Sequence, residues 1–186
     1  MSEIDNTLRL VDREIWLVTA THENRRGGLI ATFVNQASIV PELPRMLVGI
    51  AKQHHTHGLI EASHAFTLHL LDDSHLDWVW RFGLESGHAT DKFTDRPALD
   101  AIARLDCRVE TSMDTGDRTI YLAEVFAGRL EKRTPPLTMK RLLQLASPEH
   151  LQKLRDGMMR DAAVDAAAIR AWRNRGDLQA DIVPLC

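Results

Sequence analysis

The densest cluster of potentially reactive side chains is the segment 52–57, with the sequence KQHHTH. It holds three histidines within four positions, and neutral imidazole is a common metal ligand. However, the segment has no carboxylate or cysteine at a metal-binding spacing, and the chain has no HExxH or CxxC motif. A lysine, several other donors and a threonine at a predicted helix start suit an anion better, because free N–H groups at a helix N-terminus favour negative charge. We therefore predict a phosphate site here, with a metal ion or a plain polar loop as the alternatives.

A second candidate binding segment is 27–36, with the sequence GGLIATFVNQ. Glycine lets a backbone approach another backbone or a ligand closely, and the small side chains of Ala31 and Thr32 leave room above a strand. The segment is neither a Walker loop, since no GKS or GKT follows, nor a GxGxxG fingerprint. A tight hairpin that leads into an ordinary strand is the structural alternative. The chain also lacks a GxSxG motif, and Cys107 lies in a strand-like pattern that indicates a structural role.

Short apolar runs separated by turn signals predict strands in the first two thirds of the chain. The predicted strands are residues 14–21, 29–40, 46–51 and 66–71, followed by a long hairpin of 105–113 and 118–130. Two short helices lie among them, residues 57–63 with Thr56 as N-cap and residues 74–84 with Ser74 as N-cap. Because only one short helix separates 46–51 from 66–71, a series of βαβ units is disfavoured. We predict an antiparallel barrel with small helical insertions.

The pattern becomes helical after two consecutive prolines at 135–136. Residues 137–146 are predicted to form one short helix. Ser147, Pro148 and Glu149 then supply an N-cap, a proline at the first helical position and an early acidic residue, which together indicate a helix start. This helix is predicted to reach about Asn174 and to stop at Gly176, with a bend at Gly157. Its alanine-rich stripe needs a partner surface, which we expect to be the barrel or a subunit boundary.

The composition excludes several classes of protein. The chain has 186 residues, of which 44% are hydrophobic, and 23 basic residues against 26 acidic ones give a net charge of −3. This balance offers no general field for nucleic acid or an anionic membrane. No apolar run approaches the ~20 residues that span a bilayer, and two cysteines form neither a disulfide framework nor a metal pair. We expect a globular, cytoplasmic protein that binds neither nucleic acid nor membrane.

Taken in order, these segments resemble the flavin reductase-like family, whose members fold as an FMN-binding split barrel. Residues 28–38 (GLIATFVNQAS) are similar to the family's strand of Gly, Leu or Met, Thr, a small residue and Ser or Asn, followed by Gln-x-Ser. Residues 52–60 resemble its Lys-x-x-x-Thr phosphate loop and short helix, and residues 66–71 (FTLHLL) its F-x-V-N-x-L strand. Lys92 and Phe93 resemble its KF signature, and residues 116–125 its GDH…GEV strand pair.

The resemblance implies a mainly β fold, a Greek-key antiparallel split β-barrel of residues 1–135, with short helical insertions and a C-terminal helical extension of the same domain at 136–186. FMN would lie along the second strand. Its isoalloxazine edge would meet backbone groups of Ile30, Ala31, Thr32 and Phe33, and its ribityl chain would lie near Asn35 and Ser38. Its phosphate would be held by Lys52, Gln53, His54, His55 and Thr56. Family members are homodimers with flavin near the subunit boundary, so a homodimer is expected.

Three positions depart from the family pattern: Ile30 replaces a threonine, Glu42 replaces a proline, and Arg118 stands where reductases carry the histidine of GDH. That histidine is associated with the nicotinamide side of the flavin, so Arg118 is the candidate catalytic residue. The resemblance implies an NAD(P)H:flavin oxidoreductase, in which NADH or NADPH gives a hydride to FMN and reduced flavin serves a partner oxygenase or another acceptor. Because Arg118 replaces the histidine, the alternative is an FMN-binding electron-transfer flavoprotein without direct NAD(P)H oxidation. A flavin-free interaction module is a third hypothesis.

Overall fold

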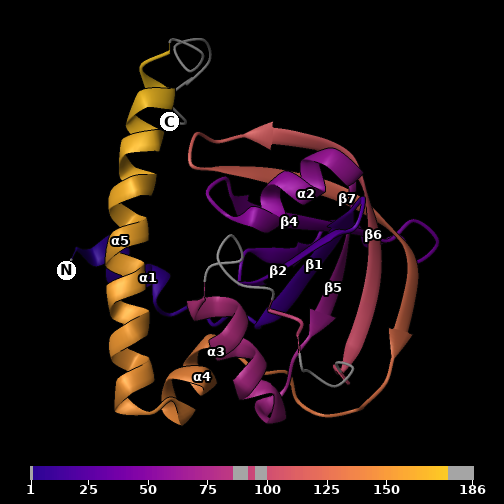
Figure 1. The fold of residues 1–186 in the computed structure, drawn as a ribbon, viewed down its shortest axis with the longest axis horizontal. Helices are drawn as coiled ribbons and strands as arrows, with labels where there is room; N and C mark the ends of the chain where they lie inside the picture. The colour runs from indigo at the N-terminus through magenta and orange to yellow at the C-terminus, as the bar shows by residue number, and fades with distance from the viewer. Residues whose placement is uncertain (1, 86–91, 95–99, 176–186) are drawn as a thin grey trace.

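A computed structural model of the chain describes residues 2–85, 92–94 and 100–175 (Figure 1). Within these residues one sheet contains seven strands: β1 (Trp16–His22), β2 (Arg25–Ala31), β3 (Val34–Gln36), β4 (Arg45–Ala51), β5 (Ala65–Leu70), β6 (Ala103–Asp114) and β7 (Arg118–Leu130). The helices are α1 (Glu3–Leu8), α2 (His55–Ser63), the 3-10 turn η1 (Asp73–His75), α3 (Leu76–Leu84), α4 (Met139–Leu145) and α5 (Pro148–Arg173).

The sheet is antiparallel and curls into a half-barrel. Its strand order is β2-β1-β5-β6-β7-β4-β3, and every neighbouring pair runs antiparallel. The predicted mainly β, antiparallel barrel with helical insertions is confirmed. The predicted hairpin of 105–113 and 118–130 is also confirmed, as β6 and β7.

The predicted single strand 29–40 is wrong, because the chain leaves the sheet between two strands. β2 ends at Ala31 on one edge of the sheet, and β3 begins at Val34 on the other edge. Thr32 and Phe33 make the crossing, and the Phe33 carbonyl accepts a hydrogen bond from Gly49 N at 2.8 Å. A Cβ on Gly49 would lie 3.2 Å from Phe33 Cβ, so a glycine there lets the crossing chain approach β4. Residues 29–34 (LIATFV) are apolar apart from Thr32, so the run continues across the crossing and hides the change of edge.

The core has two parts, one on each face of the sheet. Inside the half-barrel, fully buried side chains of successive strands pack together, namely Val18, Val48, Leu68, Cys107 and Tyr121. The second part lies between the outer face and helices α3 and α4, where Leu17, Leu71, Phe82, Leu137 and Leu142 are buried. This second cluster fixes α3 next to β2 and so forms one wall of the candidate site described below.

Two predicted helix caps are wrong. His54, not Thr56, is the N-cap of α2, and Thr56 lies inside the first turn with its side chain buried. Asp72, not Ser74, caps η1, since its Oδ1 accepts a hydrogen bond from Ser74 N at 3.0 Å. In both cases a polar residue just upstream starts the helix earlier, and the predicted cap becomes a helical residue.

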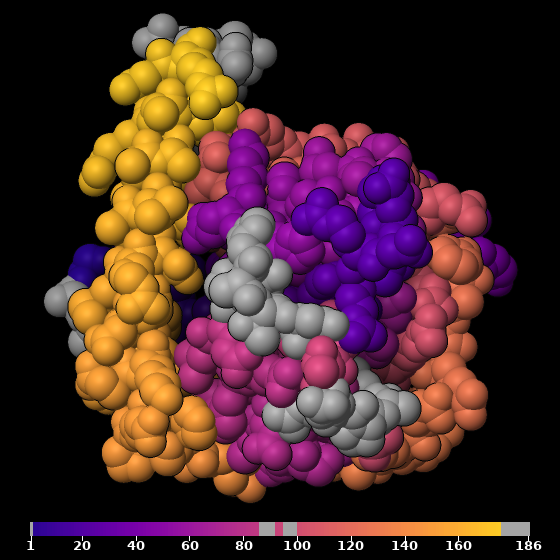
Figure 2. Space-filling view, in the orientation of Figure 1, coloured from indigo at the N-terminus to yellow at the C-terminus, as the bar shows by residue number. Residues whose placement is uncertain are grey.

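Helix α5 forms a ridge along one side of the molecule (Figure 2). It starts as predicted, with Ser147 Oγ accepting a hydrogen bond from His150 N at 3.2 Å. It continues through Gly157 as one helix to Arg173, and none of its side chains is fully buried. The predicted stop at Gly176 lies outside the described residues. Among the helices that are described, none is long and apolar enough to cross a membrane.

Candidate functional site

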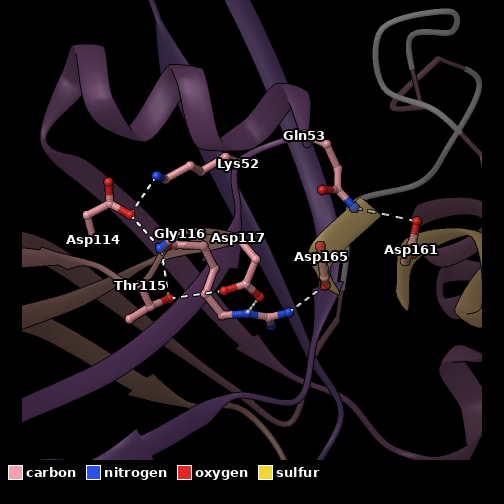
Figure 3. A network of polar contacts seen from close by, with 9 residues as sticks. Lys52, Gln53, Asp114, Thr115, Gly116, Asp117, Asp161 and Asp165 are labelled. Atoms are coloured by element: carbon pink, nitrogen blue, oxygen red, sulfur yellow. Dashed lines mark hydrogen bonds and ion pairs between the residues drawn. The ribbon is translucent and has the colours of Figure 1, made fainter. Parts of the chain in front are cut away.

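Lys52 is the first residue after β4, and its charge is already balanced by the β6–β7 hairpin. Its Nζ donates a hydrogen bond to Asp114 Oδ1 at 2.6 Å (Figure 3). Its backbone N–H donates to the Asp117 carbonyl at 3.0 Å. Hydrogen bonding from Lys52 lowers the pKa of Asp114. The side chain of Lys52 remains 37% exposed, so the ammonium is accessible from solvent.

The rest of the predicted phosphate loop leads into α2. Gln53 and His54 are exposed, whereas the Thr56 side chain is buried. His55 Nδ1 lies 3.4 Å from Arg25 Nη2 on β2. A Cβ on Gly27 would lie 2.9 Å from Thr56 Oγ1, so only a glycine lets β2 approach the start of α2 this closely. The loop is therefore held against β2, and the N-terminus of α2 lies at its end.

This loop lines a cavity of about 360 Å³. The cavity is bounded by β2, the 53–56 loop, α3 and α5, and its lining residues are Gly28, Leu29, Gln53, His54, His55, Thr56, Phe82, Gly83, Leu84, Glu85, Lys92, Lys153, Asp156, Gly157, Arg160 and Asp161. Gly28 sets one wall, because a Cβ there would lie 2.6 Å from the Phe82 ring. The structure thus brings four of the five residues predicted for the phosphate into one hollow.

Lys92 is a buried cation in this cavity, with only 5% of the residue exposed. Its Nζ donates to the carbonyl oxygens of Phe82 at 3.0 Å and Gly28 at 3.4 Å. Burial lowers its pKa from 10.5 to about 8, and the negative charge of Glu85 opposes this shift. An anion in the cavity would meet Lys92 in a setting of low dielectric, where charge attracts charge strongly.

Arg118 begins β7 opposite Ala51, the last residue of β4. Its Nε donates to Asp117 Oδ2 at 2.5 Å and its Nη2 donates to Asp165 Oδ2 of α5 at 2.9 Å. The guanidinium also lies 4.7 Å from the centre of the Phe33 ring, a cation–π contact. The guanidinium of Arg13 lies 5.2 Å from the same ring centre, and Phe33 as a whole remains 48% exposed.

The remaining predicted cofactor residues follow the crossing from β2 to β3. Ile30 and Ala31 end β2, Thr32 is half-buried in the crossing, and Asn35 lies exposed on β3. Asn35 lines a separate hollow with Trp16 and Met46, and Ser38 lines another beyond β3. The structure therefore places Phe33 and Arg118 together near the start of the phosphate loop. The lining of the 360 Å³ cavity includes none of the residues predicted for the isoalloxazine, the ribityl chain or the nicotinamide, namely Ile30, Ala31, Thr32, Phe33, Asn35, Ser38 and Arg118.

Several residues of this site were not predicted from the sequence. Lys92 had a signal, since it belongs to the Lys-Phe pair, although that pair gave it no role. Asp161 and Asp165 are four residues apart and so share one face of α5. Which part of the barrel this face meets depends on how α5 packs, and helix periodicity does not specify that.

A second cavity, of about 510 Å³, opens on the other face of β1, β5 and β6. None of the residues predicted for the flavin or the nicotinamide lines it. Thr19 Oγ1 lies 3.1 Å from His69 Nε2, and Thr67 donates to Asp106 at 2.8 Å. Burial lowers the pKa of His69 to about 4, so this imidazole is neutral at pH 7. Within residues 2–85, 92–94 and 100–175, no group of three or more His, Cys, Asp or Glu side chains is placed to hold a metal ion.

Comparison with known proteins identifies a family and a fold. Residues 8–142 match the family described as flavin reductase like domain. The chain is 26% identical over 142 residues to a protein named putative diflavin flavoprotein A 3 from Nostoc sp., a match that covers 70% of this chain and 24% of that protein. The chain thus spans about a quarter of the length of that relative.

Two solved structures share the fold. One is the styrene monooxygenase flavin reductase of Pseudomonas putida S12, with a TM-score of 0.63, 21% identity, and coverage of 74% of this chain and 92% of that one. The other is an FMN-binding protein of Thermus thermophilus, with a TM-score of 0.59, 22% identity, and coverage of 65% and 72%. At these identities the likeness describes the fold alone.

Proposed function

The chain belongs to the flavin reductase-like domain family, and from this membership we propose that it binds FMN and reduces it with NADH or NADPH. The observation that carries the proposal is the cavity that joins the 53–56 loop to the buried cation Lys92. A helix N-terminus, a polar loop and a buried ammonium together suit a phosphate group.

The residues present fit FMN. Lys52, Gln53, His54, His55 and the N-terminal N–H groups of α2 would hold the phosphate. The exposed ring of Phe33 offers a flat surface next to the backbone of the β2–β3 crossing. Bound flavin would supply the redox chemistry, accepting a hydride from the nicotinamide, while the protein binds and orients both partners. Arg118, which lies over Phe33, is the residue we assign to the nicotinamide side.

The test uses the purified full chain with FMN and each nicotinamide cofactor. FMN fluorescence should be quenched on binding, and absorbance at the nicotinamide band should fall when NADH or NADPH is added. Lys52→Ala should weaken FMN binding about tenfold or more, since a hydrogen bond between charged groups contributes roughly 1.5–3 kcal/mol. Lys140→Ala, a change of the same kind on α4, should leave the affinity unchanged. Absence of FMN binding by the wild-type protein would refute the proposal.

One observation favours a second function, that of an electron-transfer flavoprotein which does not oxidise NAD(P)H itself. Arg118 is paired with both Asp117 and Asp165, and these carboxylates neutralise the charge that would attract a nicotinamide nucleotide. In this case the FMN-bound protein would stay oxidised with NADH or NADPH but would be bleached by dithionite. Oxidation of either nicotinamide above the background rate would select the reductase instead.

We also infer a homodimer and an oxygenase that accepts the reduced flavin. Phe126 and Leu130 of β7 are each 55% exposed, and a partner subunit would cover such apolar side chains. The inferred oxygenase rests on the similarity in fold to a styrene monooxygenase flavin reductase. Light scattering on the eluting protein should give twice the chain mass of 21.0 kDa, and a mass of one chain would refute the dimer.

A further inference from the structure

Helix α5 packs against the β6–β7 hairpin beside the candidate flavin site (Figures 1 and 3). Gly116, at the tip of this hairpin, has φ +93°, a conformation that favours glycine. A Cβ at Gly116 would lie 2.7 Å from Trp172 Cβ and 3.0 Å from the Ala168 carbonyl. The C-terminal half of α5 therefore rests directly on the turn that precedes Arg118.

Two carboxylates of α5 accept hydrogen bonds from Gln53, which we assign to the flavin phosphate, and from Arg118, which we assign to the nicotinamide side. Asp165 Oδ2 accepts a hydrogen bond from Arg118 Nη2 at 2.9 Å. One helical turn earlier, Asp161 Oδ1 accepts from Gln53 Nε2 at 3.5 Å (Figure 3). Gln53 belongs to the predicted phosphate loop, and Arg118 follows the turn of the hairpin whose Asp114 pairs with Lys52. A phosphate on this loop must compete with Asp161 for Gln53, and Asp165 adds a further negative charge beside the start of the loop.

The ion pair between Asp165 and Arg118 satisfies only one of the two carboxylate oxygens of Asp165. Asp165 Oδ1 is buried, and no donor among the described residues reaches it. Burial raises the pKa of Asp165, the charges of Asp117 and Asp161 raise it further, and the guanidinium of Arg118 opposes them. A buried carboxylate oxygen without a hydrogen bond is unfavourable, so this contact stabilises the packing of α5 on the hairpin less than its short distance suggests.

The packing of α5 also allows it to move. None of its side chains is fully buried, whereas Leu17, Leu68 and other side chains of the barrel are. A helix that buries little apolar surface can detach locally at a small cost in free energy. Release of Arg118 and Gln53 from α5 therefore does not require the barrel to unfold.

We propose that Asp161 and Asp165 determine the specificity of the flavin site, because Asp161 competes with a flavin phosphate for Gln53 and Asp165 places a second negative charge beside the same loop. This inference rests on the proposed FMN binding. The carboxylates lower the affinity for a flavin that carries a phosphate and have little effect on riboflavin, which carries none. Asp161 and Asp165 thus set how well the site distinguishes FMN from riboflavin.

The experiment compares FMN and riboflavin binding, followed by flavin fluorescence, in the full chain and in Asp165→Ala and the Asp161→Ala/Asp165→Ala double variant. Alanine is the best helix former, so these changes do not weaken α5 itself, and circular dichroism verifies the helix content. The double variant should bind FMN about tenfold more tightly than wild type, with riboflavin affinity changed by less than about twofold. The matched control is Asp73→Ala, which also frees an arginine, Arg141, but away from the cavity.

Each result is decisive. Unchanged or weaker FMN binding by the double variant would overturn the inference while leaving FMN binding by the wild type intact. An equal gain for riboflavin would also overturn it, because α5 would then exclude flavin by its bulk and not by its charge. If neither wild type nor variant binds FMN, the proposed function fails as well, so the two failures are distinguishable.

Discussion

The buried ammonium of Lys92 predicts an unusual dependence of stability on pH. Its pKa is lowered from 10.5 to about 8 in the folded chain, mainly by burial. Between these two values the unfolded chain holds a proton that the folded chain has released. Because the unfolded state binds more protons there, the contribution of Lys92 to the free energy of unfolding rises with pH. Below pH 8 both states are charged, and the cost of burying the charge is fully present.

The size of the effect follows from the shift. One pKa unit corresponds to about 1.4 kcal/mol, so the shift of Lys92 amounts to about 3 kcal/mol between pH 8 and pH 10.5. Lys92→Met removes the charge and also the hydrogen bonds to Phe82 O and Gly28 O. Each neutral hydrogen bond contributes about 1 kcal/mol, and this loss depends much less on pH than the charge does. The difference in the free energy of unfolding between wild type and Lys92→Met therefore changes with pH as Lys92 titrates.

Urea unfolding at intervals from pH 7 to pH 10.5 measures this difference. We expect the wild type to gain about 3 kcal/mol relative to Lys92→Met across the range, with most of the gain above pH 8. Lys140→Met on α4 is the control and should give a curve parallel to that of the wild type. A constant difference between wild type and Lys92→Met would refute the reasoning, since Lys92 would then titrate as in the unfolded chain.

Two further predictions concern packing. Gly28→Ala should lower the free energy of unfolding by about 1–3 kcal/mol, because its Cβ would meet the buried Phe82 ring at 2.6 Å. Gly58→Ala in α2 should raise the free energy of unfolding by about 0.5–1 kcal/mol, because no described atom lies within 4 Å of the added Cβ. Equal effects of the two changes in thermal melting would contradict the packing argument. Cys107 is buried, and burial raises the pKa of its thiol to about 12, so iodoacetamide at pH 8 should label it only in urea. Peptide mass mapping that found native labelling at the unfolded rate would show that the strand is open.

The sequence predicted those parts of the fold that depend on local pattern. The β6–β7 hairpin follows from two alternating runs around a turn with Gly116, and the start of α5 follows from Ser147 and Pro148. The division of 29–40 into β2 and β3 was not predictable in this way. Thr32 and Phe33 continue the apolar pattern while the chain changes sheet edge, and this change is decided by distant strands.

The candidate site was also predictable only where local sequence determines it. The 52–57 cluster was identified by its chemistry, and the structure brings Gln53, His54, His55 and Thr56 into one cavity. Asp161 and Asp165 could not be assigned, because their partners Gln53 and Arg118 are distant in sequence. Helix periodicity places both carboxylates on one face of α5, but only tertiary packing determines what that face meets.

The two-residue link at Thr32 and Phe33 also bears on the order of folding. It joins a β1–β2 hairpin to a β3–β4 hairpin that lie at opposite edges of the sheet. Both hairpins need only short loops to close, whereas β4 meets β7 through pairs as distant in the chain as Arg45 and Glu124. Closing so long a loop costs entropy before any contact is gained, so the β4–β7 pairing is expected to form late and to limit the folding rate.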